Sequence, residues 1–540
     1  MYESDFNRSE NRFGSASWAQ EDDLRRAGLF SSSGLHLGFW GKRRLRLESD
    51  APAILFGGSG AGKTRDYLGF VCCDSPGVPA LILDPRGELG AISFRAHALH
   101  NEAAWFWNPM GIGAWLPKHQ SVNPLDILDI GAPTFHADAK FIAEGLVTMT
   151  SGEGRYFDQR ARDLIEALMK SAVERFGSVS FPKLAHIINT IEGDPNAWAD
   201  HLEAMLASRF DDVRRTASEA LVKQQDSPRE WGSIMGSLYA NMGWASDPAL
   251  LASLKGGDFS FKALVDPHRV SKIFLNVPAE YLQIWSPILR VMFTTAMLYK
   301  ARAPQARRVL LVVDEAGQLG KAEFILRGFT FARGAGVRML ALFQDAGQVV
   351  AHYGEAGLQT LIGSAQTRIW FGIRDSRTAE LVSRMAGTET LAYDDYLAQD
   401  DAQRRRSEMA QRVLQGENPF TLASEYAQYA RASEHRTKQA RPLLALDEAL
   451  AMREDRALVF ISGKNLRPAM VGKLPYFASE RAMAGKYLPN PYHPPLDSVP
   501  VVGRFGSRRA RVTWGRVPAK YAHLPQHRDG RWPMIDGFPD

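Results

Sequence analysis

Residues 57–64 read GGSGAGKT and directly follow an apolar run at residues 53–56 (AILF). A strand that leads into a glycine-rich turn and then a helix lets consecutive backbone N–H groups surround a phosphate, and the helix dipole favours the anion. Lys63 would then reach the β- and γ-phosphates of a nucleotide, and the Thr64 hydroxyl would bind Mg²⁺. A glycine turn with an exposed lysine is the alternative interpretation. We expect the whole loop to bind nucleotide: Gly57, Gly58, Ser59, Gly60, Ala61, Gly62, Lys63 and Thr64.

Two adjacent carboxylates, Asp314 and Glu315, follow a second apolar run at residues 309–313 (VLLVV). In open α/β sheets, ligands bind outside the carboxyl ends of the strands. We therefore expect Asp314 to hold Mg²⁺ through water and Glu315 to polarise the attacking water. A pair of this kind also occurs as a helix cap, which is the alternative. Combined with the phosphate loop, the pair predicts an enzyme that hydrolyses ATP with the help of Mg²⁺.

Gln344 and Arg333 flank a third apolar run at residues 338–343 (RMLALF). A polar side chain at the end of this strand would contact both the attacking water and the γ-phosphate, so we expect Gln344 to take part in catalysis. An arginine in the preceding loop would neutralise transition-state charge in a neighbouring subunit, which is the role expected for Arg333. The alternatives are a turn amide for Gln344 and a surface arginine for Arg333.

The elements that must position these residues form an α/β fold. Near-continuous apolar strands separated by helices are what a parallel sheet covered on both faces requires. A helical pattern between about residues 136 and 241 interrupts this alternation and predicts an inserted domain. The expected domains are a flexible arm at 1–34, a nucleotide-binding domain at 35–135 and 261–480, a helical insertion at 136–260, and a tail rich in Pro and Arg at 481–540.

Composition narrows the class of protein. The chain has 540 residues, is 45% hydrophobic and 23% charged, and has a formal net charge of +5, which is ordinary for a soluble globular protein. Cys72 and Cys73 are its only cysteines, so neither a disulfide framework nor a zinc site is available. No window approaches eighteen apolar residues, so we expect no membrane span and no secretory signal.

Local basic clusters make contact with a polyanion plausible. Each of them could also be a solvated surface. They are Lys42, Arg43, Arg44 and Arg46; Arg404, Arg405 and Arg406; Arg431, Arg436, Lys438 and Arg441; and Arg508, Arg509 and Arg511.

A series of separate motifs in fixed order resembles the TraG/TraD family of type IV secretion coupling proteins. In chain order they are GGSGAGKT, LILDPRGEL, VNPLDIL, LLVVDEAGQL, FARGAGVRMLALFQD, HYGEAG, SAQTRIWFGIRDSRTAELVSRMAGTET, RPLLALDEAL and ALVFISGKNLRPAM. The similarity runs from about residue 35 to residue 477. The resemblance implies a RecA-like P-loop NTPase core, an insertion called the all-alpha domain, and a hexameric ring with a central channel. It also implies that Arg333 is a trans-acting arginine finger and Gln344 a sensor.

The sequence departs from the family in two places. Members usually begin with two transmembrane helices, and this sequence shows none, so it resembles a soluble member or one that a separate membrane subunit recruits. We accordingly expect a cytoplasmic protein, peripheral at the inner membrane through its partners. The asparagine common in the SAQT region is absent, and Ser364 or Gln366 lies in its neighbourhood.

The resemblance therefore implies an ATP-hydrolysing coupling protein, stimulated by DNA, that moves DNA or a relaxase–DNA complex into a type IV secretion channel. Its implied partners are DNA bound without sequence preference, a relaxase or secreted effector, channel components or a membrane subunit, and further copies of the chain in a hexamer. Two alternatives stay open, which are a DNA-translocating motor of the FtsK and HerA type and a nucleotide-dependent docking adaptor without turnover.

Overall fold

The chain divides into two compact units. A computed structural model describes residues 11–113, 116–150, 152–394, 396–415, 436–479, 483, 485–488, 490, 492, 498–503, 506–522 and 530–535. The first unit, called here the core unit, comprises Glu21–Gly372, Arg453–Leu466 and Met470–Asp540. The second, called the ribbon unit, comprises Met1–Gln20, Ile373–Met452 and Arg467–Ala469.

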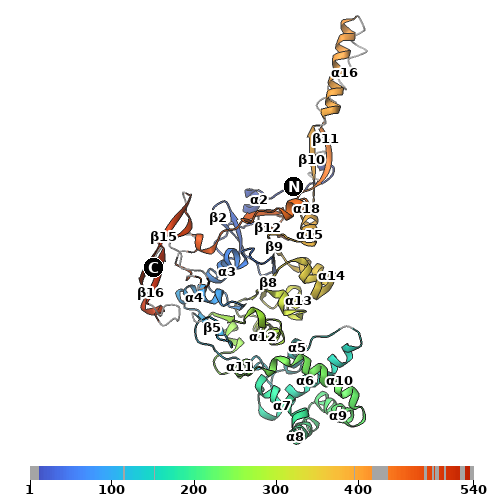
Figure 1. Cartoon of the computed structure of the whole chain (residues 1–540), viewed down its shortest axis with the longest axis vertical. Helices are drawn as coiled ribbons and strands as arrows, with labels where there is room; N and C mark the ends of the chain where they lie inside the picture. Colours follow the sequence, from blue (N-terminus) through green and yellow to red (C-terminus); the bar gives the residue numbers. More distant parts are fainter. Residues whose placement is uncertain are drawn as a thin grey trace. The chain divides into compact units, whose positions relative to one another are not determined.

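One large mixed sheet organises the core unit (Figure 1). From β9 to β5 every neighbouring pair of strands is parallel, whereas β12 runs antiparallel to β9, and β1 runs antiparallel to both β13 and β2. In spatial order the strands are β2 (Arg43–Leu47), β1 (Leu35–Trp40), β13 (Ala469–Gly472), β12 (Arg456–Ile461), β9 (Thr367–Phe371), β3 (Ala53–Gly57), β8 (Val337–Phe343), β7 (Val309–Val313), β4 (Ala80–Leu83), β6 (Ser271–Leu275) and β5 (Ala103–Trp107).

The central strands are apolar because helices cover both faces of the sheet. Every residue of β3, β7 and β4 is buried, as a parallel sheet between helical layers requires. Phe56 of β3 stacks on Trp370 of β9 with ring centroids 4.2 Å apart. The helices that connect these strands are α3 (Gly69–Cys73), α4 (Glu88–Leu99), α12 (Ser286–Arg302), α13 (Glu323–Thr330) and α14 (Ala346–Ser364).

A group of helices is inserted between β5 and β6 (Figure 1). Its first helix, α5, packs against both α12 and α6, so it joins the group to the sheet layer. Among the described residues no helix is both long and apolar enough to cross a membrane. The inserted helices are α5 (Phe135–Leu146), α6 (Gly154–Phe176), α7 (Phe181–Gly193), α8 (Pro195–Leu206), α9 (Asp211–Asp226), α10 (Pro228–Asn241) and α11 (Pro248–Ser253).

Part of the expected flexible arm is folded. Residues Glu21–Arg26 form helix α2, and Leu24 and Leu29 are completely or almost completely buried. The backbone N–H of Arg46 in β2 donates to the carbonyl of Leu29. The physical reason is that two leucines in a polar segment supply enough apolar surface to order it.

The ribbon unit interrupts the expected second part of the nucleotide-binding domain. Its antiparallel ribbon pairs β10 (Thr388–Asp394) with β11 (Arg436–Pro442) in an unbroken register from Thr388↔Pro442 to Asp394↔Arg436. The helices of this unit are α15 (Ser376–Ala386), α16 (Tyr396–Leu414) and α18 (Leu446–Leu450).

The described part of the expected Pro- and Arg-rich tail forms a small sheet. Its strands are β14 (Ser498–Gly503), β15 (Gly506–Arg516) and β16 (Arg531–Ile535), with β15 in the middle. Both pairings are antiparallel.

Candidate nucleotide site

The loop that follows β3 has the backbone of a phosphate cradle. Gly60 and Gly62 have φ values of +74° and +90°, which side chains other than glycine rarely adopt. A Cβ on Gly62 would also lie 2.3 Å from an Asp66 carboxylate oxygen. The loop then enters a π-helical segment, η2 (Lys63–Leu68), that continues as α3. The chain therefore turns sharply at the carboxyl edge of the sheet and presents its N–H groups there.

Lys63 joins this loop to the acidic pair. Its side chain is only 8% exposed, and its Nζ donates to the carbonyl of Gly57 at 2.9 Å. The same Nζ lies 3.1 Å from Oε1 of Glu315. Two segments about 250 positions apart in the sequence thus meet at one ammonium group.

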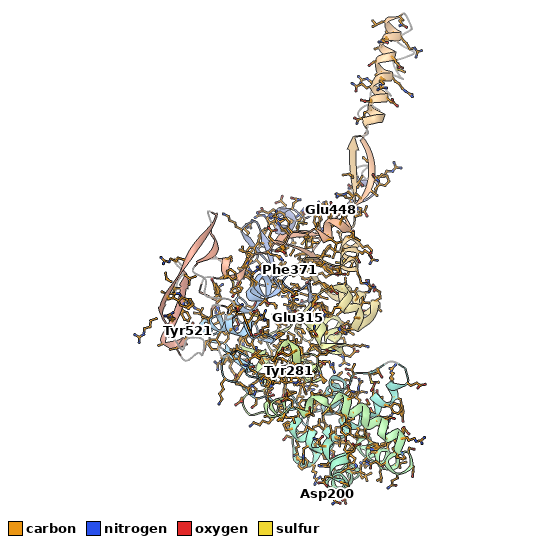
Figure 2. All side chains as sticks on the ribbon, in the orientation of Figure 1. Asp200, Tyr281, Glu315, Phe371, Glu448 and Tyr521 are labelled. Carbon is orange, nitrogen blue, oxygen red and sulfur yellow. The ribbon has the colours of Figure 1, made fainter. Side chains whose placement is uncertain are left out.

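Glu315 lies between Lys63 and Gln344. Glu315, labelled in Figure 2, comes two residues after the carboxyl end of β7. Its Oε2 accepts a hydrogen bond from Nε2 of Gln344 at 3.2 Å, and Gln348 Oε1 accepts one from the backbone N–H of Gln344 at 3.0 Å. Glu315 has φ +55° and ψ +45°, a left-handed conformation that costs a residue with a Cβ of order 1 kcal/mol. Strain of this kind is typical of functional sites.

Two buried carboxylates near Glu315, those of Asp314 and Asp84, have raised pKa values. Burial raises the pKa of Asp314 to about 7, and the nearby Glu315 and Asp84 carboxylates add to the effect. Burial also raises the pKa of Asp84 to about 6, although the N–H groups of Gly90 and Leu89 oppose it. A cation favours the ionised form of such carboxylates. The arrangement is therefore suited to a positively charged ligand.

These residues line one cavity of about 530 Å³, a volume in the range of small-molecule sites. Of the predicted site residues, it brings together the loop from Gly58 to Thr64 with Asp314, Glu315 and Gln344. Gly57 does not line the cavity, but its carbonyl accepts a hydrogen bond from Lys63, which does. The remaining lining residues are Arg65, Asp84, Pro85, Arg86, Glu88, Leu89, Ala279, Leu282 and Gln318.

Several of these lining residues were not assigned a role from the sequence. The DPRGEL turn that follows β4 gave a signal as a family motif, and it places Arg86 and Glu88 at the cavity. Ala279 and Leu282 follow β6 and carry no motif. Only the strand order, in which β6 lies beside β4, brings them to the same edge.

Arg333 lies away from the cavity of its own chain. It precedes β8, whereas Gln344 follows it. Because β8 is parallel to β3, the loop before β8 lies at the opposite edge of the sheet from the phosphate loop. There Nε of Arg333 donates to Asp50 at 2.9 Å, and the side chain is 57% exposed.

Ser364 and Gln366 are also distant from the cavity. Both precede β9, at the amino edge of the sheet. The Gln366 side chain bonds to Ser49 and to the carbonyl of Ser462. Neither residue lies where a nucleotide sensor would have to be.

The basic clusters are placed differently from one another. Arg44 and Arg46 both pair with the buried Asp74, so this cluster stabilises the edge of the sheet. Residues 404–406 lie on α16, and Arg431 falls outside the described residues.

Within the described part of the chain, no group of three or more His, Cys, Asp or Glu side chains is arranged to hold a metal on its own. Mg²⁺ is commonly bound by one or two side chains together with the phosphates of a nucleotide. Thr64 and Asp314, which face the same cavity, are a donor set of that kind.

The sequence matches one protein family over most of its length. Residues 15–492 match the family described as type IV secretory system conjugative DNA transfer. The chain is 24% identical over 362 residues to the type IV secretion system-coupling protein VirD4 of Bartonella quintana. This match covers 63% of this chain and 53% of VirD4. It is 24% identical over 427 residues to the conjugal transfer protein TraG of Escherichia coli, which covers 70% of this chain and 65% of TraG. The chain thus spans about half the length of the VirD4 relative.

Solved structures share the fold. The bacterial conjugative coupling protein TrwBdeltaN70 superimposes with a TM-score of 0.60 at 16% identity, covering 87% of this chain and 95% of that one. The plasmid coupling protein TrwB in complex with ADP and Mg²⁺ has a TM-score of 0.58 at 16% identity, covering 85% and 94%. The predicted fold class, a RecA-like P-loop NTPase core with a mostly parallel sheet and a helical insertion, is confirmed.

Proposed function

The chain belongs to the type IV secretory system conjugative DNA transfer family, and from this membership we propose that it is an ATP-hydrolysing coupling protein. It recruits DNA or a relaxase–DNA complex and drives it into a type IV secretion channel. The observation that carries the enzymatic part is the chain of contacts from Lys63 to Glu315 at 3.1 Å and from Glu315 to Gln344 at 3.2 Å.

This chain of contacts joins the three strands that a hydrolase of this type needs. The N–H groups of the loop from Gly57 to Thr64 would hold the phosphates of ATP. Thr64 and Asp314 would hold Mg²⁺, which neutralises charge on the β- and γ-phosphates. When the phosphates attract the Lys63 ammonium, Glu315 loses its ion pair and is available to accept a proton from water. Gln344, bonded to the same carboxylate, then orients that water.

Arg333 completes the site of a neighbouring subunit in this proposal. Its place at the opposite edge of the sheet from its own phosphate loop prevents it from reaching that loop. An exposed guanidinium at that edge can reach a second copy of the chain, where it would stabilise transition-state charge. A closed ring, a hexamer as in the family expectation, gives every site one such arginine.

The remaining partners follow from family membership. They are DNA held through its phosphates without sequence preference, a relaxase or secreted effector, and channel components or a membrane subunit. These partners would keep the chain at the cytoplasmic face of the inner membrane.

Steady-state hydrolysis tests the proposal. We expect Mg²⁺-dependent ATP turnover that DNA stimulates. Lys63→Ala should lose both ATP binding and turnover. Glu315→Gln should keep ATP binding and lose about a hundredfold or more in turnover. Glu323→Gln is the matched control, because this carboxylate lies on α13, is 47% exposed and does not line the cavity. A chain that binds ATP but shows no turnover with any DNA would be a docking adaptor instead.

A further inference from the structure

The positive charge of the chain is concentrated at its C-terminal end. Residues 498–540 contain eight Lys and Arg residues and three Asp residues, a formal net charge of +5. The whole chain has the same net charge of +5, so residues 1–497 hold as many acidic as basic side chains. Seven of the eight basic residues are arginines, which bond phosphate bidentately and stack on planar rings. This distribution suits a polyanionic partner.

One face of the C-terminal sheet is committed to packing on α4. Trp532 of β16 belongs to a buried cluster with Leu488, Val517 and Tyr521, and Phe94 of α4 and Met534 pack against it. The Arg95 guanidinium of α4 lies 5.0 Å from the Trp532 ring centroid. Tyr521, labelled in Figure 2, stacks on the same ring at 5.0 Å. Trp532 and Met534 therefore define the inner face.

The opposite face presents an indole and two guanidinium groups to solvent. Side chains alternate along a strand, so Arg531 and Pro533 lie on the outer face of β16. Their cross-strand partners on β15 are Arg516 and Trp514, respectively. Both arginines are exposed, and the Trp514 side chain is 49% exposed.

This combination suits one kind of ligand. Arg516 and Arg531 lie directly opposite each other, with their Cβ atoms about 5 Å apart, so one anion can contact both guanidinium groups. A half-exposed indole gains burial energy when a flat ring covers it. A ligand that supplies both an anion and a flat ring therefore fits this face. Single-stranded nucleic acid offers both, since its bases stack on aromatic side chains while basic groups hold its phosphates.

We propose that the outer face of the C-terminal sheet binds single-stranded DNA, with a base stacked on Trp514 and a neighbouring phosphate held between Arg516 and Arg531. The proposal deepens the proposed function and rests on it, because it names a surface outside the ATP site where the transferred DNA contacts the chain. A duplex hides the faces of its bases in the stack, so the indole selects the single strand. An anionic membrane is the competing partner, but Trp514 lies within a strand, opposite Pro533, and not at a projecting loop tip.

Binding of the full chain to a labelled single-stranded oligonucleotide, followed by fluorescence anisotropy, tests the aromatic part. Trp514→Ala should weaken binding about fivefold or more, as expected for one lost stacked base. Trp514→Phe keeps an aromatic ring and should stay within about threefold of wild type. Binding to a duplex of the same sequence should change much less in either variant.

The salt dependence of binding tests the arginine pair. The double variant Arg516→Ala/Arg531→Ala should reduce the slope of log affinity against log salt by about 0.7, the value for one phosphate contact on a single strand. The matched control is Arg209→Ala/Arg453→Ala, which removes the same charge from two side chains that are 58% and 75% exposed elsewhere. The control should leave the slope nearly unchanged.

The outcomes separate this proposal from the motor. If ATP turnover is stimulated by DNA but single-strand affinity is the same in the Trp514 and arginine variants, the sheet proposal fails and the motor stands. If turnover is absent but single-strand affinity depends on Trp514, the sheet proposal stands and the motor fails. If the variants lose binding only to vesicles containing phosphatidylserine, the face is a membrane patch and the proposal is overturned.

Discussion

Arg290 ties the segment that follows the acidic pair to the helical insertion. It lies on α12 and is only 6% exposed. Its Nε donates to the carbonyl of Gly145 in α5 at 2.9 Å, and its Nη1 donates to the carbonyl of Leu319 at 3.3 Å. Leu319 ends the short helical segment that begins directly after Glu315. We therefore expect Arg290 to transmit strain between the nucleotide site and α5.

Replacing Arg290 with methionine keeps the length of the side chain and removes its donors. Each carbonyl left without a partner costs about 1–3 kcal/mol. Burial lowers the pKa of Arg290 to about 10, so removal of the charge recovers up to about 3 kcal/mol of desolvation. Two carbonyls at about 2 kcal/mol each, less up to about 3 kcal/mol recovered, leave a net loss of unfolding free energy of at least about 1 kcal/mol. A similar loss in the positioning of Glu315 corresponds to about tenfold in kcat.

Lys300 provides a matched control on the same helix. It is fully buried, and its Nζ bonds to the carbonyls of Ala303 at 2.9 Å and Pro304 at 3.3 Å. Lys300→Met thus removes a buried cation and two carbonyl contacts without touching the segment after Glu315. Both variants should lower the melting temperature measured by calorimetry.

Only Arg290→Met should lower kcat in the DNA-stimulated ATPase assay, with the Kd for ATP within about twofold of wild type. Equal losses of kcat in Arg290→Met and Lys300→Met would refute the reasoning, because the effect would then follow from general destabilisation. An Arg290→Met enzyme with full turnover would refute it as well.

Three further predictions address assembly, the sensor and stability. Arg333→Ala should keep ATP affinity and lose turnover, and mixing it with Glu315→Gln protein should restore activity at mixed interfaces; no rescue would contradict a role in trans. Gly317→Ala would place a Cβ 2.0 Å from Cδ of Gln348 and so displace the side-chain amide that accepts a hydrogen bond from the Gln344 backbone. We expect kcat to fall several-fold while ATP affinity is unchanged. An unchanged kcat would show that the Gln348–Gln344 hydrogen bond is not needed for turnover. Burial lowers the pKa of His97 to about 4, below its ordinary 6.5. The buried neutral ring therefore costs no stability above pH 6.5, and the free energy of unfolding falls by about 3 kcal/mol as the pH drops from 6.5 towards 4. The melting temperature of wild type should therefore drop more over this range than that of His97→Gln, and equal drops would count against the assignment.

The parts of the site that the sequence predicts are those encoded locally. The loop from Gly57 to Thr64 and the pair Asp314 and Glu315 each follow an apolar strand, and a strand that ends at the carboxyl edge of a parallel sheet places the next residues at the ligand crevice. Gln344 follows the same rule on the neighbouring strand. The contacts between these residues required only that the three strands be adjacent, as they are in the sheet.

The parts that could not be predicted depend on strand order or on distant packing. Ala279 and Leu282 reach the cavity because β6 lies beside β4, although about 190 residues separate the two strands in the sequence. Leu24 is buried inside a segment whose polar composition indicates a mobile arm. The β10–β11 ribbon shows little hydrophobic alternation, so no strand pattern in the sequence predicts its pairing. The role of Arg333 depends on a second copy of the chain.

The proposed hydrolysis requires that the phosphate loop and the acidic pair of the same chain share one triphosphate. A structure of the chain with Mg²⁺ and a non-hydrolysable ATP analogue measures this directly. We predict a γ-phosphate within hydrogen-bonding distance of Lys63 Nζ, with Mg²⁺ between Thr64 and Asp314 and a water beside Glu315. A nucleotide bound elsewhere, or one whose γ-phosphate lies far from Glu315, would contradict the account.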